Sequence, residues 1–164
     1  MKIIIPMSGI GKRFVEAGYK DPKPLIQVEN KTIIEHVINL FDKENDDYVF
    51  ICNDLHLRTT EMRNILKSIV PNCTIYEVSV ENRKGPVDAV MQIASKEIND
   101  EDQIIVSYCD YGTQWNYEKF KEEVKEFDLD GAIPSYIHFH PHMLGSDNYA
   151  FIKEEDKNFI AIQE

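Results

Sequence analysis

Apolar and polar positions follow two different periods along much of the chain. Short runs with the β-branched composition or the alternation of sheet strands lie at residues 3–5, 48–52, 74–80 and 103–108. Segments with apolar residues at helical spacing lie at residues 33–41, 55–69 and 86–94. Strands that alternate with helices in this order predict an α/β fold, a Rossmann-like three-layer α/β/α arrangement with a mainly parallel central sheet.

Local signals mark where these helices begin. Thr32 and Glu35 have the spacing of a capping box, and Asp54 precedes the second helical segment as a candidate cap. Pro86 suits the first position of the third helix, because the N–H that proline lacks has no helical partner at that position.

The pattern changes after residue 110 to a small mixed β region near the C-terminus. Residues 118–127 predict a charged helix. Further strands are predicted at residues 131–139, 149–153 and 159–163. Because no internal repeat, low-complexity tract or linker interrupts the sequence, we expect one continuous domain over residues 1–164.

The composition is ordinary for a globular domain, with 43% apolar and 29% charged residues in 164. No apolar run is long enough to span a bilayer and no signal-peptide pattern is present, so we expect a cytosolic protein without a membrane partner. Cys52, Cys73 and Cys109 lie in or beside apolar runs, which favours buried thiols over disulfides or a zinc site.

The net charge of −11 argues against nucleic acid as a partner, since binding to a phosphate backbone requires a basic patch. The charge is unevenly distributed, however. Residues 1–31 contain six Lys or Arg and three Asp or Glu. A locally positive segment in an acidic protein favours a small phosphorylated ligand.

The stretch after the first apolar run has the parts of a polyphosphate site. Ser8, Gly9 and Gly11 have little side chain, so backbone N–H groups can approach an anion, and Lys12 and Arg13 add positive charge. The spacing excludes two common glycine loops. A P-loop has four residues between its first glycine and Gly-Lys-Ser/Thr, and a dinucleotide fingerprint has a third small residue where this chain has Phe14.

A second basic segment follows at Pro22-Lys23-Pro24-Leu25. The prolines fix φ on both sides of Lys23 and so restrict where its ammonium can point. Together, Gly9-x-Gly11-x-Arg13 and this segment resemble the nucleotidyltransferase family that makes nucleoside-diphosphate sugars and related activated head groups. An ordinary βα turn with solvated cations is the alternative.

The resemblance implies roles for these residues. The nucleotide would contact Met7, Ser8, Gly9, Gly11 and Lys12. Arg13 would stabilise the leaving pyrophosphate, and Lys23 would bridge the acceptor phosphate and the α-phosphoryl oxygens.

Lys84-Gly85-Pro86 resembles the family's second nucleotide loop, which lies against the base and sugar. The usual Gly-Thr-Ala pattern is replaced here by Gly85-Pro86-Val87, so the residues that select the nucleotide differ from that pattern. A plain loop that begins a helix is the alternative interpretation of this segment.

Asp110 directly follows the fourth apolar run, and ligands of open α/β sheets gather at the carboxyl ends of the strands. The resemblance implies that Asp110 holds Mg²⁺ as the cofactor. A turn or cap residue is the alternative.

The resemblance also suggests weaker acceptor contacts from Tyr111, Tyr136, His140 and Asn148. Alternating histidines around His140 have a spacing that a metal site could use, but acceptor contacts or plain surface are favoured. The last strands resemble the family's acidic hairpin, with Glu164 as its glutamate. The family continues beyond this point with a second metal-binding Asp, so we expect its C-terminal elements to be missing here.

The predicted activity is transfer of a nucleoside monophosphate from a nucleoside triphosphate, with CTP favoured, to a small phosphorylated acceptor. The Ile-Pro-Met-Ser-Gly form of the loop resembles capsule and surface-polysaccharide members, including cytidylyltransferases for phosphocholine or phosphoglutamine. Two alternatives are a glycosyltransferase that uses a nucleotide sugar and a non-catalytic nucleotide-binding module. Gly112 stands where the glycosyltransferase Asp-x-Asp pair would have its second Asp.

Overall fold

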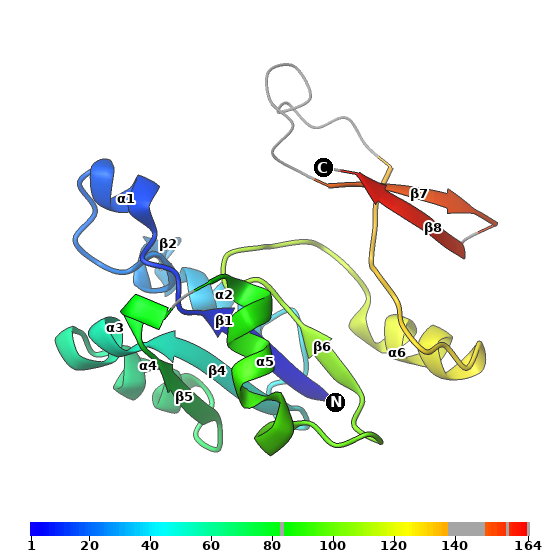
Figure 1. Cartoon of the computed structure of the whole chain (residues 1–164), viewed down its shortest axis with the longest axis horizontal. Coiled ribbons are helices and arrows are strands. Elements are labelled where there is room, and N and C mark those ends of the chain that lie inside the picture. Colours follow the sequence, from blue (N-terminus) through cyan, green and yellow to red (C-terminus); the bar gives the residue numbers. More distant parts are fainter. Residues whose placement is uncertain (83, 138–149, 157, 164) are drawn as a thin grey trace. The chain divides into compact units, whose positions relative to one another are not determined.

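The computed structural model describes residues 1–82, 84–137, 150–156 and 158–163. They form two compact units, Met1–Tyr117 and Glu118–Glu164, whose elements are labelled in Figure 1. The expectation of one continuous domain stays a prediction.

A parallel sheet forms the centre of the first unit, with the strand order β5-β4-β1-β6. The strands are β1 (Lys2–Met7), β4 (Asp47–Asn53), β5 (Thr74–Val78) and β6 (Ile104–Val106). β1 pairs along its whole length with β4, so that Met7 lies opposite Cys52 at the carboxyl end. The predicted parallel central sheet is confirmed.

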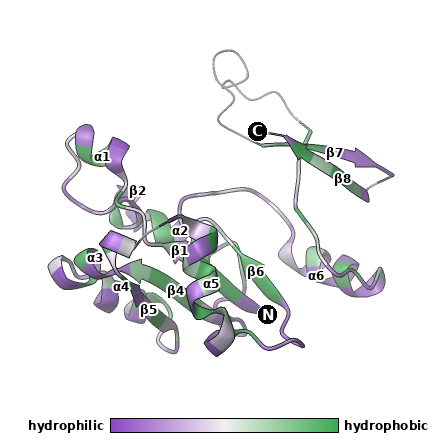
Figure 2. Ribbon diagram, viewed as in Figure 1, coloured by the Kyte–Doolittle hydropathy of each residue, from purple (hydrophilic) through white to green (hydrophobic). Residues whose placement is uncertain are grey.

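Helices cover both faces of this sheet (Figure 1). On one face, α2 (Ile33–Ile38) and α4 (Met62–Ile69) pack against Ile3 and Ile5 of β1. On the other face, α5 (Pro86–Glu97) packs against Ile4 of β1. Figure 2 shows the largely hydrophobic β4 between these layers. The first unit therefore has the three-layer α/β/α architecture that the sequence predicts.

The helix starts predicted from local signals are largely correct. The Thr32 side chain accepts a hydrogen bond from the Glu35 backbone N–H at 3.3 Å, and the Glu35 carboxylate accepts one from the Thr32 backbone N–H at 3.0 Å, which completes the capping box. α5 begins at Pro86. α2, however, ends at Ile38, earlier than the apolar spacing indicates.

The single helix predicted over 55–69 is wrong. The segment forms α3 (Asp54–Thr59) and α4, separated at Thr60, whose backbone is extended (φ −137°, ψ 168°). The Thr60 hydroxyl accepts a hydrogen bond from the Met62 backbone N–H at 3.3 Å, and this local bond offers the backbone an alternative to continued helix. The cap of α3 is Asn53 rather than Asp54.

β6 is shorter and less buried than its apolar composition predicts. It spans Ile104–Val106 and pairs only with β1 in the described sheet, where it is the edge strand. The exposed fractions of Ile104 and Val106 are 37% and 54%. A run of β-branched residues thus indicated a strand correctly but not its burial.

Short elements complete the first unit. They are α1 (Lys12–Glu16), η1 (Lys23–Leu25), β2 (Gln27–Val28), β3 (Lys31–Thr32) and η2 (Val80–Asn82). β2 and β3 form a small antiparallel pair, and Glu29 and Asn30 between them both have positive φ. No helix of the described residues is long and apolar enough to cross a bilayer.

The second unit contains most of α6 (Tyr117–Glu126) and an antiparallel hairpin of β7 (Phe151–Glu155) and β8 (Asn158–Gln163). The predicted helix and hairpin, and with the hairpin the small C-terminal β region, are confirmed. The strand predicted over 131–139 is wrong for residues 131–137, which have no strand structure and are exposed. His140, Asn148 and Glu164 lie outside the described residues.

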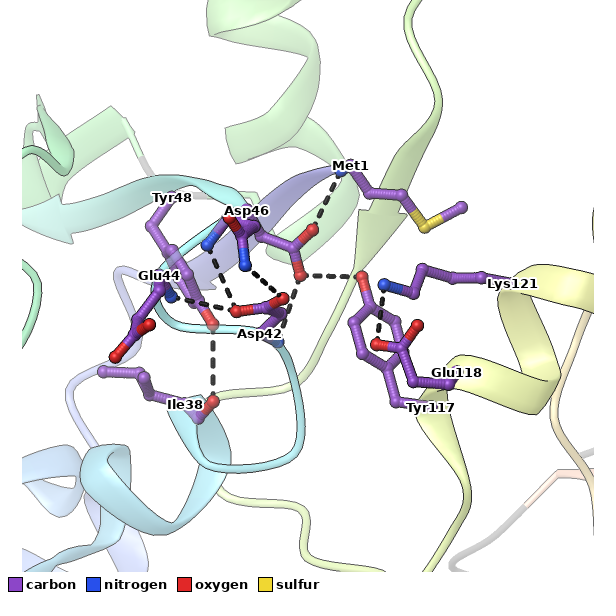
Figure 3. A network of polar contacts seen from close by, with 10 residues as sticks. Met1, Ile38, Asp42, Glu44, Asp46, Tyr48, Tyr117, Glu118 and Lys121 are labelled. Carbon is purple, nitrogen blue, oxygen red and sulfur yellow. Dashed lines mark hydrogen bonds and ion pairs between the residues drawn. The ribbon is translucent and has the colours of Figure 1, made fainter.

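A buried polar network lies at the amino ends of β1 and β4 (Figure 3). Asp46 accepts a hydrogen bond from the Met1 ammonium at 2.8 Å and another from the Tyr117 hydroxyl at 2.7 Å. The Asp46 side chain is only 3% exposed, so these partners compensate a charge that would otherwise be costly to bury. Because the strands are parallel, this network lies at the amino ends of the strands, opposite the loops that follow their carboxyl ends.

Candidate active site

The strand order reverses between β1 and β6. From β1 the chain adds β4 and then β5 on one side, and it returns to add β6 on the other side of β1. Ligands of open α/β sheets bind outside the carboxyl ends of the strands at such a reversal. The residues that follow β1 and β6 therefore form the candidate site.

The loop after β1 leaves its backbone accessible. Ser8 is buried, Gly9 is exposed, and nothing lies within 4 Å of the place where a Gly9 Cβ would be. Gly11 has a left-handed backbone (φ 64°, ψ 42°), and a Cβ there would lie 3.4 Å from the Lys23 Cβ. The Met7 side chain packs in the core, so Met7 can offer a ligand only its backbone.

Two cations follow this loop on α1. Lys12 and Arg13 are both exposed. The Lys12 ammonium lies 3.6 Å from the Glu16 carboxylate, but both side chains are mostly in solvent, so this pair contributes little stability. Both cations are therefore accessible to an anionic ligand.

Lys23 is held on a rigid segment. Pro22 precedes η1, and Pro24 and Leu25 within it are buried, which anchors the backbone on both sides of the lysine. The Lys23 ammonium lies 5.0 Å from the centroid of the Phe14 ring, within the range of a cation–π contact. The expectation that the prolines position this side chain agrees with this geometry.

The Lys23 ammonium also forms an ion pair with the Asp110 carboxylate, although the two residues are 87 positions apart in sequence. The side chains are 24% and 30% exposed, so solvent screens this pair only in part. The structure thus brings together a residue from the Pro-Lys-Pro segment and the carboxylate that follows β6.

Asp110 is the residue that the resemblance makes the candidate ligand of Mg²⁺. The described residues contain no cluster of three or more His, Cys, Asp or Glu that could hold a metal. Mg²⁺ keeps several waters and is usually bound by one or two carboxylates together with substrate phosphates. One carboxylate that contacts Lys23 beside the Gly9–Gly11 loop fits that mode of binding.

The second loop follows β5, and like the first it lies at the carboxyl ends of the parallel strands. Lys84 is exposed, and Gly85 precedes α5 with a φ of 139°, a conformation that side chains disfavour. Pro86 occupies the first turn of α5. In the sheet order β4 lies between β1 and β5, so the end of β4 separates this loop from the first.

Asn53, the last residue of β4, contacts the first loop, and Asp54, the first residue of α3, contacts the second. The Asn53 amide donates to the Ser8 carbonyl at 3.2 Å, and the Asp54 carboxylate accepts from the Val80 backbone N–H at 3.0 Å. Sequence reasoning treated Asp54 only as a cap and did not select Asn53. Two polar residues at the carboxyl end of a buried strand were the signal that could have indicated them.

The remaining predicted residues are placed as follows. Tyr111 follows Asp110 and is 45% exposed, whereas Tyr136 belongs to the second unit and is 62% exposed.

Burial raises the pKa of the Cys109 thiol to about 11, so this thiol is protonated at neutral pH and is a poor nucleophile. All three cysteines are free thiols; Cys52 and Cys73 are buried, as predicted, whereas Cys109 is only half-buried.

The chain is similar in sequence to two curated proteins, and no family model matches it. It is 56% identical over 39 residues to 2-C-methyl-D-erythritol 4-phosphate cytidylyltransferase of Wigglesworthia glossinidia brevipalpis, which covers 24% of this chain and 16% of that protein. It is 30% identical over 110 residues to the bifunctional protein GlmU of Buchnera aphidicola subsp. Schizaphis graminum, which covers 67% of this chain and 22% of that protein.

Solved structures extend the similarity to the whole chain. A Bacillus anthracis protein assigned as a glucose-1-phosphate thymidylyltransferase matches 100% of this chain with a TM-score of 0.72 at 17% identity. The chain has the nucleotidyltransferase fold. The nucleoside-diphosphate-sugar pyrophosphorylase of Vibrio cholerae RC9 matches 99% of it with a TM-score of 0.63 at 19% identity. This chain covers 64% and 66% of those two chains, respectively.

Proposed function

We propose that the protein is a nucleotidyltransferase that moves a nucleoside monophosphate from a nucleoside triphosphate to the phosphate of a small acceptor. The observation that carries this proposal is the contact between Lys23 and Asp110 beside the Gly9–Gly11 loop, at the reversal of strand order in a nucleotidyltransferase fold. A site that combines exposed backbone N–H groups, fixed cations and one carboxylate suits phosphoryl chemistry.

The first loop and its cations would bind the triphosphate. Backbone N–H groups around Gly9 can approach phosphate oxygens closely, because a Cβ is absent there and the space around it is open. Lys12 would add charge along the phosphates, and Arg13 would stabilise the leaving pyrophosphate. The exposure of both side chains supports this assignment.

The acceptor phosphate would be the nucleophile. Its second pKa is about 6, so it is ionised at pH 7 and requires no general base. One of its oxygens attacks the α-phosphorus, the bond from that phosphorus to the β-phosphate oxygen breaks, and pyrophosphate leaves with the electron pair. The main task of the protein is then to hold several anions together.

Lys23 would bridge the acceptor phosphate and the α-phosphoryl oxygens. Its rigid backbone and its contact with Phe14 support a fixed position for the ammonium. Asp110 would hold Mg²⁺ together with the substrate phosphates, and the ion would supply neutralisation of charge on the phosphoryl oxygens.

We favour CTP as the nucleotide and a capsule or surface-polysaccharide precursor as the product. The Ile-Pro-Met-Ser-Gly form of the loop supports this choice, as does the short match to a cytidylyltransferase. Acceptor contacts from Tyr111, Tyr136, His140 and Asn148 stay predictions. We place the reaction in the cytoplasm, where nucleoside triphosphates are supplied.

Pyrophosphate release by the purified protein tests this proposal. Each of the four nucleoside triphosphates is supplied with Mg²⁺ and a panel of sugar phosphates, phosphocholine and phosphoglutamine. We expect release that depends on both CTP and one acceptor. Transfer from a nucleotide sugar without any triphosphate would instead indicate a glycosyltransferase, and triphosphate binding without turnover would indicate a binding module.

A further inference from the structure

We propose that Asn53 and Asp54 are positioning residues that hold the two nucleotide loops in a fixed relation to each other. The inference rests on the proposed function and deepens it, because it explains how the phosphate loop after β1 is aligned with the base loop after β5. Neither residue need touch the substrate. Their adjacency at the end of one buried strand is what couples the loops.

Asn53 holds the first loop. Its side chain is fully buried, and its amide nitrogen donates to the Ser8 carbonyl at 3.2 Å. In a planar trans peptide the carbonyl and the following N–H point in opposite directions, so a Ser8 carbonyl turned toward Asn53 directs the Gly9 N–H away from it. Asn53 thereby sets the direction of a backbone donor in the phosphate loop.

Asp54 holds the second loop. One carboxylate oxygen accepts from the Val80 backbone N–H at 3.0 Å and from the Leu55 N–H at 2.9 Å. The other oxygen is paired with the Arg58 guanidinium at 2.6 Å. Val80 begins η2, the turn that precedes Gly85 and Pro86. The carboxylate therefore fixes where the base loop begins.

These contacts exceed what helix capping requires. The cap of α3 needs only the Asn53 side-chain oxygen, which accepts from the His56 N–H at 2.7 Å. Besides their local partners, which for the Asn53 amide nitrogen is His56 Nδ1 at 2.9 Å, the amide nitrogen of Asn53 and the carboxylate of Asp54 also bind segments 45 and 26 positions away. Because both residues extend from the end of β4, which is paired on both sides, the two loops are held before nucleotide binds.

Separate variants isolate each contact. Asn53→Asp keeps an N-cap oxygen, since Asp caps helices about as well as Asn, but it removes the amide nitrogen that contacts the Ser8 carbonyl and His56 Nδ1. Asp54→Ala removes the acceptor of Val80, whereas Asp54→Asn keeps an amide oxygen in its place. Arg58→Met is the matched control, because it removes the ion pair and leaves the bond to Val80.

The first measurement is the backbone order parameter from ¹⁵N relaxation in the nucleotide-free protein, which requires no activity. We expect the value at Gly9 to fall in Asn53→Asp and the value at Val80 to fall in Asp54→Ala, each from about 0.85 toward 0.6. Asp54→Asn and Arg58→Met should keep the wild-type value at Val80. Unchanged values in the first two variants would overturn the inference.

The second measurement is the Kd and KM for CTP with Mg²⁺. We expect both to rise about five- to tenfold in Asn53→Asp and in Asp54→Ala, with a smaller change in kcat, because each variant loses one aligning hydrogen bond. Asp54→Asn should restore most of the loss, and Arg58→Met should match wild type. If the wild type is active and both Asn53→Asp and Asp54→Ala keep its Kd and KM for CTP, the positioning role is rejected and the proposed function is not. A wild type that neither binds nor turns over any triphosphate would reject the proposed function and this inference together.

Discussion

The Lys23 ammonium forms an ion pair with the Asp110 carboxylate at the point where the strand order reverses. One residue comes from a proline-flanked turn and the other from the segment that follows β6, and each was selected from the sequence for a separate reason. The pair keeps a cation and a carboxylate at the place where the triphosphate and the acceptor phosphate would meet.

Replacement of Lys23 tests the cationic half of this pair. We expect Lys23→Met to lower kcat for pyrophosphate release by about 10²–10³, because a preorganised charge that stabilises the transition state is lost. Lys96→Met removes an exposed lysine near the end of α5 and should leave kcat unchanged. Equal rates for the two variants would remove Lys23 from the mechanism.

Replacement of Asp110 tests the magnesium assignment. Asp110→Asn should lower Mg²⁺-dependent pyrophosphate release by about 10²–10³ and raise the Mg²⁺ concentration needed for half-maximal rate. Asp100→Asn, at an exposed turn, is the control. If Asp110→Asn kept the wild-type rate and magnesium dependence, the ion would have to be held elsewhere.

The two glycines of the first loop should respond differently to alanine. Gly11→Ala should lower the free energy of unfolding by about 1–2 kcal/mol, because Gly11 has a φ of 64°. The new Cβ would make ordinary van der Waals contact with the Lys23 Cβ at 3.4 Å, so the loss comes from the backbone conformation alone. Gly9→Ala has open space and should keep stability while raising the KM for CTP. Urea unfolding and steady-state kinetics measure both effects, and equal unfolding midpoints would contradict the strain at Gly11.

The polar network at the opposite edge of the sheet should affect stability alone. Tyr117→Phe removes the hydroxyl that donates to Asp46 at 2.7 Å, and we expect a loss of about 1.5–3 kcal/mol in the free energy of unfolding. The kcat and KM should stay at wild-type values, because this network lies at the amino ends of the strands. Urea unfolding gives the first quantity, and a changed KM would show that this edge influences the site.

The Asp54 carboxylate should make stability depend on pH in acid. The hydrogen bond from the Val80 N–H is the main cause that lowers the pKa of this carboxyl in the folded protein. A lowered folded-state pKa gives stability that is complete above the unfolded value, about 3.9, and that is lost as pH falls through the folded value. The difference in urea midpoint between wild type and Asp54→Asn should therefore be constant from about pH 8 to 5. It should shrink toward zero below about pH 4. A difference that widened in acid would contradict this sign.

Local rules predicted most of the first unit. The apolar run at Ile3–Ile5, the capping box at Thr32 and the start of α5 at Pro86 all depend on neighbours within one turn or strand, and all three were predicted correctly. The approach of Lys23 to Asp110 was also predictable in outline, because parallel strands bring their carboxyl ends to one edge.

Features that depend on distant partners were missed. The exposure of Val106 follows from the edge position of β6, and the composition of the strand does not indicate it. The bonds from Asn53 to Ser8 and from Asp54 to Val80 join separate segments, so a local pattern can indicate the two residues but not their partners. The break at Thr60 is accompanied by a local bond from the Met62 N–H to the Thr60 hydroxyl, which apolar spacing does not reveal.

The fate of labelled phosphate tests the central claim most directly. CTP labelled at the α-phosphorus or at the γ-phosphorus is incubated with the protein, Mg²⁺ and the acceptor that supports release. The account predicts that the α label appears in the acceptor product and the γ label in pyrophosphate. Release of the γ label as orthophosphate, with the α label left on the nucleotide, would contradict it.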